Sequence, residues 1–232
     1  MILALLFIPL LLLGVQMTPM IAEVNPFKKK SNFQITNYSD KYIAVEFTIL
    51  KIQDTTIKET RVETEDFLVY PSQFILPPKS SKNVRTHYIN NTIQEQEQVY
   101  RTIARELDIE INDTNQSKKK SGITFKFIYE GLIFVGTDDF KSNLKITSIT
   151  QKNDIIKMTI ENTGNKSDII TTNNYEIKAI KNNKSYTLKK ELSHKIKFRR
   201  ILPFSKHTYT FSISKTFPEI KGIDTLVLKR IQ

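Results

Sequence analysis

Apolar and polar residues alternate along most of the chain. The clearest run is Ile43, Val45, Phe47 and Ile49, with Ala44, Glu46 and Thr48 between them. Shorter runs of the same kind fall within 33–35, 99–105, 123–129, 156–160, 175–179, 209–213 and 226–228. A period of two places one set of side chains in a core and the other in water, so these runs predict strands. Clusters of Asn, Asp, Ser, Gly and Pro separate them, which is typical of an all-β sandwich.

Residues 94–107 leave a choice between helix and strand. Their Glu and Gln residues favour a helix, whereas Val99, Tyr100, Thr102 and Ile103 favour a strand. We predict a strand here.

Two stretches of sequence occur twice in the same order. Phe33-Gln34-Ile35-Thr36-Asn37-Tyr38-Ser39 is echoed by Met158-Thr159-Ile160-Glu161-Asn162-Thr163-Gly164, and Ile75-Leu76-Pro77 is echoed by Ile201-Leu202-Pro203. The interval from Ile35 to Ile75 is 40 residues, and that from Ile160 to Ile201 is 41. The repeat predicts two domains of one kind, joined near the polar turn at 136–139.

The first 15 residues are almost wholly apolar. This run is too short to span a bilayer comfortably and fits the apolar region of a secretory signal, so we predict a signal peptide over 1–16 and export. A buried strand or helix is the alternative, and it is disfavoured because the run has no polar face.

Composition limits the chemistry that is possible. The 232 residues include no cysteine, which excludes disulfides and thiolate metal sites. The net charge of +11, from 35 Lys and Arg against 24 Asp and Glu, allows a polyanion-binding protein as one reading. The lysines are spread from Lys28 to Lys229, however, and this favours a solvated surface and no nucleic-acid partner.

No catalytic pattern stands out. The histidines His87, His194 and His207 lie in different segments without metal-ligand spacing, and neither a Gly-x-Ser-x-Gly elbow nor a phosphate-binding glycine loop occurs. The pair Asp138-Asp139 indicates a turn and not an acid–base pair. We therefore predict no enzyme activity, no cofactor and no small-molecule substrate.

Several short segments, taken in order, resemble one known family. They are Met17-Thr18-Pro19-Met20, Phe33-Gln34-Ile35-Thr36-Asn37, Ile43-Ala44-Val45-Glu46-Phe47, Phe67-Leu68-Val69-Tyr70-Pro71, Ile75-Leu76-Pro77, Val84-Arg85 and Tyr100-Arg101-Thr102-Ile103-Ala104-Arg105-Glu106-Leu107. Together they are similar to the first domain of PapD-like periplasmic chaperones of pilus assembly, over residues 17–135.

The resemblance implies two tandem immunoglobulin-like sandwiches set like a boomerang, over 17–137 and 138–232. It also implies a periplasmic chaperone that binds pilus or fimbrial subunits by donating a strand, with an outer-membrane usher as second partner. The alternative interpretation is an exported immunoglobulin-like structural or adhesive module that binds a partner and does not pass it on.

The same resemblance suggests binding residues. In the family, an arginine of the first strand and a lysine of the last strand of domain one grip the carboxylate of the subunit. The strand at 124–129 resembles that last strand, so Lys126 is the expected lysine, although it could equally be a solvent-facing residue between core aromatics. The first arginine of the chain is Arg61, so Lys28, or its neighbours Lys29 and Lys30, would have to stand in for the arginine. Ile123 and Phe125 are the candidate donor side chains, and they could equally belong to the core.

Overall fold

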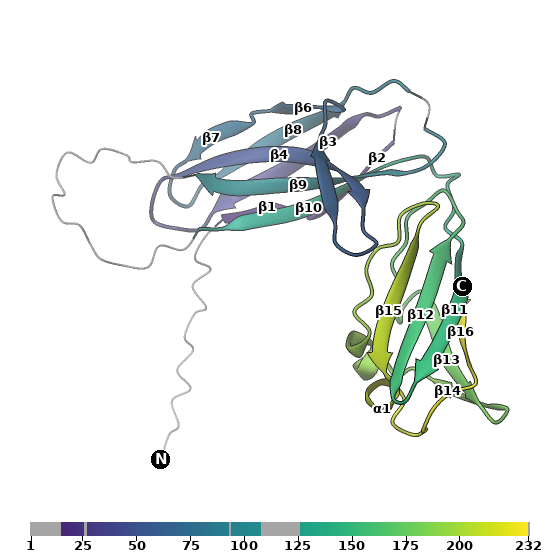
Figure 1. Cartoon of the computed structure of the whole chain (residues 1–232). Coiled ribbons are helices and arrows are strands. Elements are labelled where there is room, and N and C mark those ends of the chain that lie inside the picture. The colour runs from purple at the N-terminus through teal and green to yellow at the C-terminus, as the bar shows by residue number, and fades with distance from the viewer. Residues whose placement is uncertain (1–14, 26, 93, 108–125, 232) are drawn as a thin grey trace, which may run out of the picture. The chain divides into compact units, whose positions relative to one another are not determined.

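The computed structural model describes residues 15–25, 27–92, 94–107 and 126–231 (Figure 1). Residues 1–14 of the predicted signal, together with Ile123 and Phe125, therefore lie outside the described residues. The last two residues of that signal, Val15 and Gln16, are described and belong to the first strand, where they pair with Asn37 and Thr36. Strands dominate, which confirms the all-β class. The chain divides into two compact units. The first consists of residues up to Leu50, Glu63–Asn91 and Tyr100–Phe134, and the second of Lys51–Val62, Thr92–Val99 and Val135–Gln232.

The strands of the first half of the chain form two sheets. One has the order β1-β3-β8-β6, and the other has the order β2-β10-β9-β4-β5 with β7 paired to β4. Their bounds are β1 Val15–Thr18, β2 Ile21–Val24, β3 Lys30–Asn37, β4 Ile43–Asp54, β5 Thr60–Glu63, β6 Phe67–Tyr70, β7 Gln73–Leu76, β8 Ser81–Tyr88, β9 Gln98–Leu107 and β10 Ile128–Val135.

The core of the first unit lies between these sheets. Alternation places Phe33 of β3 and Phe47 of β4 inside, 0% and 1% exposed, with their ring centroids 5.3 Å apart. Phe67 packs edge-on against Tyr88 and Tyr100. The Tyr100 hydroxyl donates a 2.7 Å hydrogen bond to Asp66, and burial raises the pKa of this phenol. The sandwich predicted from period-two alternation is confirmed in this unit.

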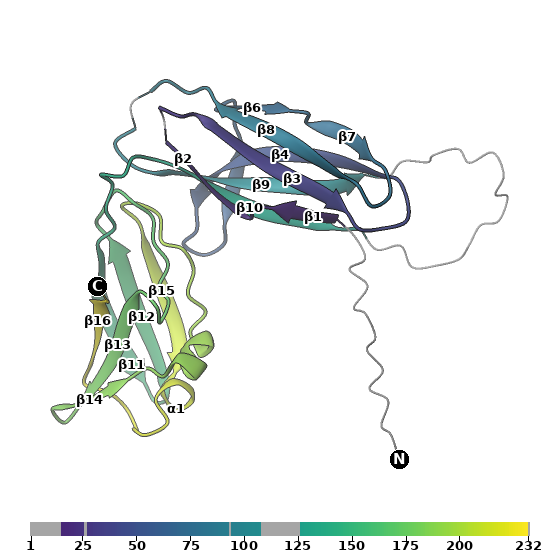
Figure 2. The same ribbon diagram turned by 180° about the vertical axis from the view of Figure 1, so that it is seen from behind.

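The second unit is a smaller sandwich (Figures 1 and 2). One sheet has the order β11-β12-β15 and the other has the order β14-β13-β16. The bounds are β11 Leu144–Lys152, β12 Ile155–Asn162, β13 Tyr175–Lys181, β14 Lys184–Thr187, β15 Lys206–Ser212 and β16 Thr225–Arg230, with a 3₁₀ helix η1 at Lys190–Lys195 and a helical turn α1 at Ile213–Thr216. Ile156, Met158 and Ile160 of β12 are fully buried in its core.

The internal repeat extends to individual hydrogen bonds. Asn37 ends β3 and donates from Nδ2 to the carbonyls of Lys41, Leu76 and Pro77. Asn162 ends β12 and donates to the carbonyls of Lys166, Ile201 and Leu202, each 125 residues further along. The predicted pairing of Ile75-Leu76-Pro77 with Ile201-Leu202-Pro203 is therefore wrong by one residue. Leu76 corresponds to Ile201, because the buried amide, and not the identity of the side chains, fixes the register.

Three local predictions can be compared with the strands. The strand predicted within 94–107 is confirmed as β9. The strand predicted through Ile213 is wrong at its end, because Ser212 caps α1 by accepting a hydrogen bond from Lys215 N. Lys126 and Phe127, predicted within a strand at 123–129, lie outside β10, which begins at Ile128.

Candidate functional site

The outer side of β10 is only partly covered by a neighbouring strand. Among the described strands, β10 is bordered by β9 on one side and by β2 on the other. Strand β2 has four residues and β10 has eight, so β2 borders at most half of that side. Backbone N–H and C=O groups along an unbordered edge are a template for another strand.

The corner between β1 and β2 brings the chain against the middle of β10. Met20 O, just before β2, accepts a 2.8 Å hydrogen bond from Leu132 N. A Cβ atom on Gly131 would lie 2.6 Å from both Met20 O and Thr102 Oγ1, and 2.9 Å from Met17 Cε. Only glycine fits there without displacing backbone. Gly131 was not among the residues predicted from the sequence, although a glycine inside a strand pattern is a known signal of close backbone approach.

Exposed apolar side chains accompany this edge. Ile128, at the start of β10, is 58% exposed, and Ile21, at the start of β2, is 54% exposed. Met20 beside them is 44% exposed. A partner that covers these side chains removes apolar surface from water, and this stabilises the complex.

The predicted anchoring lysines lie in connections between strands. Lys126 is exposed and precedes the first residue of β10 by two positions. Lys28 is exposed in the turn between β2 and β3, where its backbone N–H donates to Asn25 O at 3.0 Å. Strands β1 and β2 contain no arginine and β10 contains no lysine, so a basic pair within these strands is absent.

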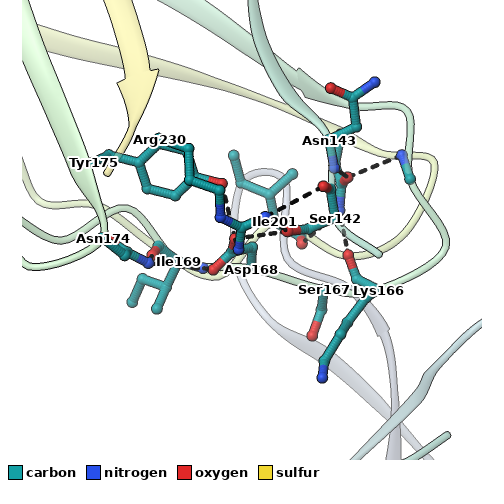
Figure 3. A network of polar contacts seen from close by, with 12 residues as sticks. Ser142, Asn143, Lys166, Ser167, Asp168, Ile169, Asn174, Tyr175, Ile201 and Arg230 are labelled. Carbon is teal, nitrogen blue, oxygen red and sulfur yellow. Dashed lines mark hydrogen bonds and ion pairs between the residues drawn. The ribbon is translucent and has the colours of Figure 1, made fainter. Parts of the chain in front are cut away.

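A polar hub in the second unit was not predicted (Figure 3). Its centre is the carboxylate of Asp168, which is 9% exposed. Oδ2 accepts hydrogen bonds from Ser142 Oγ at 2.7 Å, the Tyr175 hydroxyl at 2.8 Å and Arg230 NH2 at 2.9 Å. Oδ1 accepts from Ile169 N at 2.8 Å and from Asn174 Nδ2 at 3.4 Å.

The hub joins strands rather than presenting a reactive group. Ser142 precedes β11, Tyr175 begins β13 and Arg230 ends β16, so one carboxylate holds all three together. Burial, and next the bond to Asp168, raise the pKa of Tyr175 to about 12. Asp168 lies among Asn, Ser and Thr residues in the sequence, and it carries no signal there beyond that of a turn.

In the described part of the chain, no group of three or more His, Asp or Glu side chains is placed to hold a metal ion. None of the helices described is both long enough and apolar enough to cross a membrane.

Comparisons with known proteins give a consistent result. The sequence matches the model of the family described as pili and flagellar-assembly chaperone, PapD N-terminal domain, over residues 14–135, which is just over half of the chain. No curated protein sequence matches it.

Solved structures of similar fold cover both units. One is the CsuC–CsuE chaperone–tip adhesion subunit complex from archaic Csu pili of Acinetobacter baumannii, with TM-score 0.59, 14% identity, and 88% of this chain and 92% of that chain covered. Another is the class 5 fimbriae chaperone CfaA, with TM-score 0.57, 18% identity, and 94% and 98% covered. A third is the Salmonella enterica SafA pilin in complex with the SafB chaperone, with TM-score 0.56, 12% identity, and 95% and 97% covered. At these identities the likeness shows the two-domain immunoglobulin-like fold.

Proposed function

This chain belongs to the family of pili and flagellar-assembly chaperones, and from that premise we propose that it binds extended segments of surface-fibre subunits along the outer edge of β10. Two of the solved structures of similar fold are complexes, one with a tip adhesion subunit and one with a pilin, and this supports partners of that class. We place the action in the periplasm, after export and removal of about the first 14 residues, which would leave β1 intact. An outer-membrane usher is the proposed recipient of the subunit.

The observation that supports this function best is the partly unbordered edge of β10. A subunit strand added there would complete the main-chain hydrogen bonds of both partners. The exposed Ile128 and Ile21 would pack against alternate apolar side chains of that strand. The role proposed is binding and release, without a cofactor.

Lys126 and Lys28 are the residues we propose for gripping a subunit carboxylate. Both are exposed cations in segments next to the strands of this edge. A lysine ammonium is a compact charge, whereas an arginine guanidinium can donate two parallel hydrogen bonds to one carboxylate. A lysine–carboxylate contact would therefore be less directional than an arginine–carboxylate contact. Ile123 and Phe125 remain the proposed donor side chains.

A charge placed on the edge tests the main-chain contact. Replacing Ile128 with Asp removes an apolar contact worth about 1.5–3 kcal/mol and places an ionised group in the interface. Affinity for a co-expressed subunit should fall at least about tenfold. Ile75→Asp is the matched control, because Ile75 of β7 is 55% exposed and lies on another strand of the same sheet. Equal capture by Ile128→Asp and by the unsubstituted chain would refute the proposed edge.

Lys126→Ala tests the carboxylate grip separately. A hydrogen bond to a charged group contributes about 1.5–3 kcal/mol, so affinity should fall roughly tenfold to a hundredfold. Lys41→Ala, at an exposed lysine before β4, is the control. Unchanged capture by Lys126→Ala would leave recognition to strand pairing alone. A partner that stays bound when an usher is supplied would favour the adhesive module instead.

A further inference from the structure

Phe204 presents an exposed aromatic ring at a turn of the second unit. Its side chain is 62% exposed, and among the described residues it makes no contact with another ring or with a cation. Its φ of +52° lies in the left-handed region, which bulky residues rarely adopt. The fold therefore holds a large apolar side chain in water, on a backbone conformation that does not favour it.

The equivalent turn of the first unit shows that the fold does not require this ring. Lys79 precedes Phe204 by 125 residues, the offset of the internal repeat, and has φ +51°. In both copies the next residue, Ser80 or Ser205, donates from its hydroxyl to the carbonyl three residues earlier. Lys79 is polar and pairs with Asp40 at 3.1 Å. The turn thus accounts for the left-handed backbone, whereas the aromatic side chain at this position needs another explanation.

Phe204 lines a pocket that is rich in amide side chains. The pocket has a volume of about 760 Å³, which lies within the range of about 300–1,000 Å³ that is typical of small-molecule sites. All of its lining residues belong to the second unit. They are Gln94, Glu95, Gln96, Gln98, Lys141, Asn143, Thr163, Gly164, Asn165 and Phe204. One acid and one base stand among them, so the lining has no net charge although the chain carries +11.

Hydrogen bonds fix the two walls of this pocket to each other. Asn165 Nδ2 donates to Glu95 O at 3.2 Å, and Glu97 N donates to Asn165 O at 2.9 Å. The carboxylate of Glu97, which is 6% exposed, accepts from Ser167 N at 2.9 Å. On the other side, Asn165 Oδ1 accepts from Lys141 N at 2.8 Å. The walls are therefore held in place before a ligand binds, and this lowers the cost of ordering them.

Several polar groups of the lining remain free to bind a ligand. Within the described residues, the side-chain amide of Gln96 makes no hydrogen bond, and neither does Oδ1 of Asn143. Thr163 Oγ1 accepts from Asn143 Nδ2 at 2.8 Å, which leaves the hydroxyl proton of Thr163 to donate. Gln98 donates from Nε2 to Gln96 O at 3.2 Å and keeps Oε1 as an acceptor. The pocket thus combines donors, acceptors and one exposed aromatic ring without net charge.

We propose that this pocket binds a neutral saccharide. A pyranose ring with equatorial hydroxyl groups has an apolar face of axial C–H groups, which can cover the ring of Phe204. Its hydroxyl groups both donate and accept, as the free amides of the lining do. Single-stranded nucleic acid requires a positively charged groove, which Glu95 opposes. Proline-rich peptides dock in grooves lined by several aromatic residues, and one ring lines this pocket.

Saturation-transfer NMR of cellotriose with the full mature chain tests the proposal. Cellotriose should bind, with stronger transfer to the axial ring protons than to the exocyclic methylene protons. Phe204→Asn removes the ring, and asparagine accepts a positive φ, so the melting temperature should be unchanged while affinity falls at least about fivefold. Gln96→Ala should weaken binding about twofold to tenfold. The matched control is Phe27→Asn, which removes a ring that is 87% exposed between β2 and β3 and should bind like the parent.

Three results would overturn the proposal. They are no binding of cellotriose at millimolar concentration, equal binding by Phe204→Asn and the parent, and tighter binding of a ten-residue oligothymidylate or a decaproline peptide than of cellotriose. If Phe204→Asn lowers the melting temperature, Phe204→Tyr and Gln96→Ala decide the matter. Phe204→Tyr keeps a ring and should retain binding, whereas an unchanged affinity in Gln96→Ala, whose side chain makes no hydrogen bond within the described fold, would refute the site.

Discussion

Replacing Asn162 with Ala should selectively weaken the second unit. Asn162 is fully buried, and its Nδ2 donates to three carbonyls at 2.8–3.4 Å. Its Oδ1 accepts from Gly164 N at 3.0 Å and from Asn143 N at 3.1 Å. Alanine would remove the bonds that Asn162 makes to Lys166 O, Gly164 N and Asn143 N, whereas Ile201 O and Leu202 O keep bonds from Asp168 N and Ser205 Oγ.

The magnitude follows from the groups that lose their partners. Each buried donor or acceptor left unsatisfied costs about 1–3 kcal/mol, and water entering the vacated space restores part of this. We expect the free energy of unfolding of the second unit to fall by about 2–4 kcal/mol. This corresponds to a roughly thirtyfold to thousandfold loss of hydrogen-exchange protection where exchange requires opening of that unit.

Hydrogen exchange measured by mass spectrometry on the whole chain separates the two units. Peptides covering β12 and β15 should lose protection in Asn162→Ala, whereas peptides covering β3 and β8 should not. Asn37→Ala is the matched control and should give the opposite result, because Asn37 makes the equivalent bonds in the first unit. A loss below about 0.5 kcal/mol, or equal losses in both units, would refute the role assigned to these amides.

Three further predictions concern other residues. Burial, together with Arg199, lowers the pKa of His207 below its usual 6.5, while Asp54 opposes this shift. The contribution of His207 to the free energy of unfolding is therefore complete above about pH 6.5 and is lost as the pH falls through the folded pKa. In His207→Gln, the free energy of unfolding measured with urea should depend less on pH between pH 7.5 and 5, and the same dependence in both proteins would contradict this. Gly131→Ala should destabilise the first unit by about 1–3 kcal/mol in denaturation experiments, because its Cβ would overlap Met20 O; unchanged stability would show that the β1–β2 corner moves freely. Limited proteolysis should cut near residues 136–139 and yield two resistant fragments, and resistance there would count against a join at that turn.

The strands could be predicted where only one face of the sheet is buried, because burial of a single face produces the alternation of apolar and polar residues. In β4, Val45, Phe47 and Ile49 are buried while Glu46 and Thr48 are only partly so, and the alternation in the sequence reports this directly. The repeat was also visible, but its register was not. Both copies contain the residues Ile-Leu-Pro, but the register is set by the carbonyls that bond to Asn37 and Asn162. Every residue has a carbonyl, so the sequence does not show which of them is bonded.

The functional residues were harder to predict because they depend on long-range placement. Gly131 matters through its distance from Met20, more than a hundred residues earlier in the chain. Asp168 gains its role from Arg230 and Tyr175, which only the folded sheets bring to it.

Hydrogen exchange along β10 in a complex with a co-purified surface-fibre subunit tests the central claim most directly. If a subunit strand pairs with this edge, the backbone amides of Ile128 and Glu130, which lie on the same side of β10 as Leu132 N, should exchange at least about tenfold more slowly in the complex than in the free chain, because they become donors in a new ladder. Peptides covering β7, an edge strand of the same sheet away from β10, should exchange at the same rate in both. A subunit that binds while the β10 amides keep their free-state exchange rates would contradict strand addition at this edge.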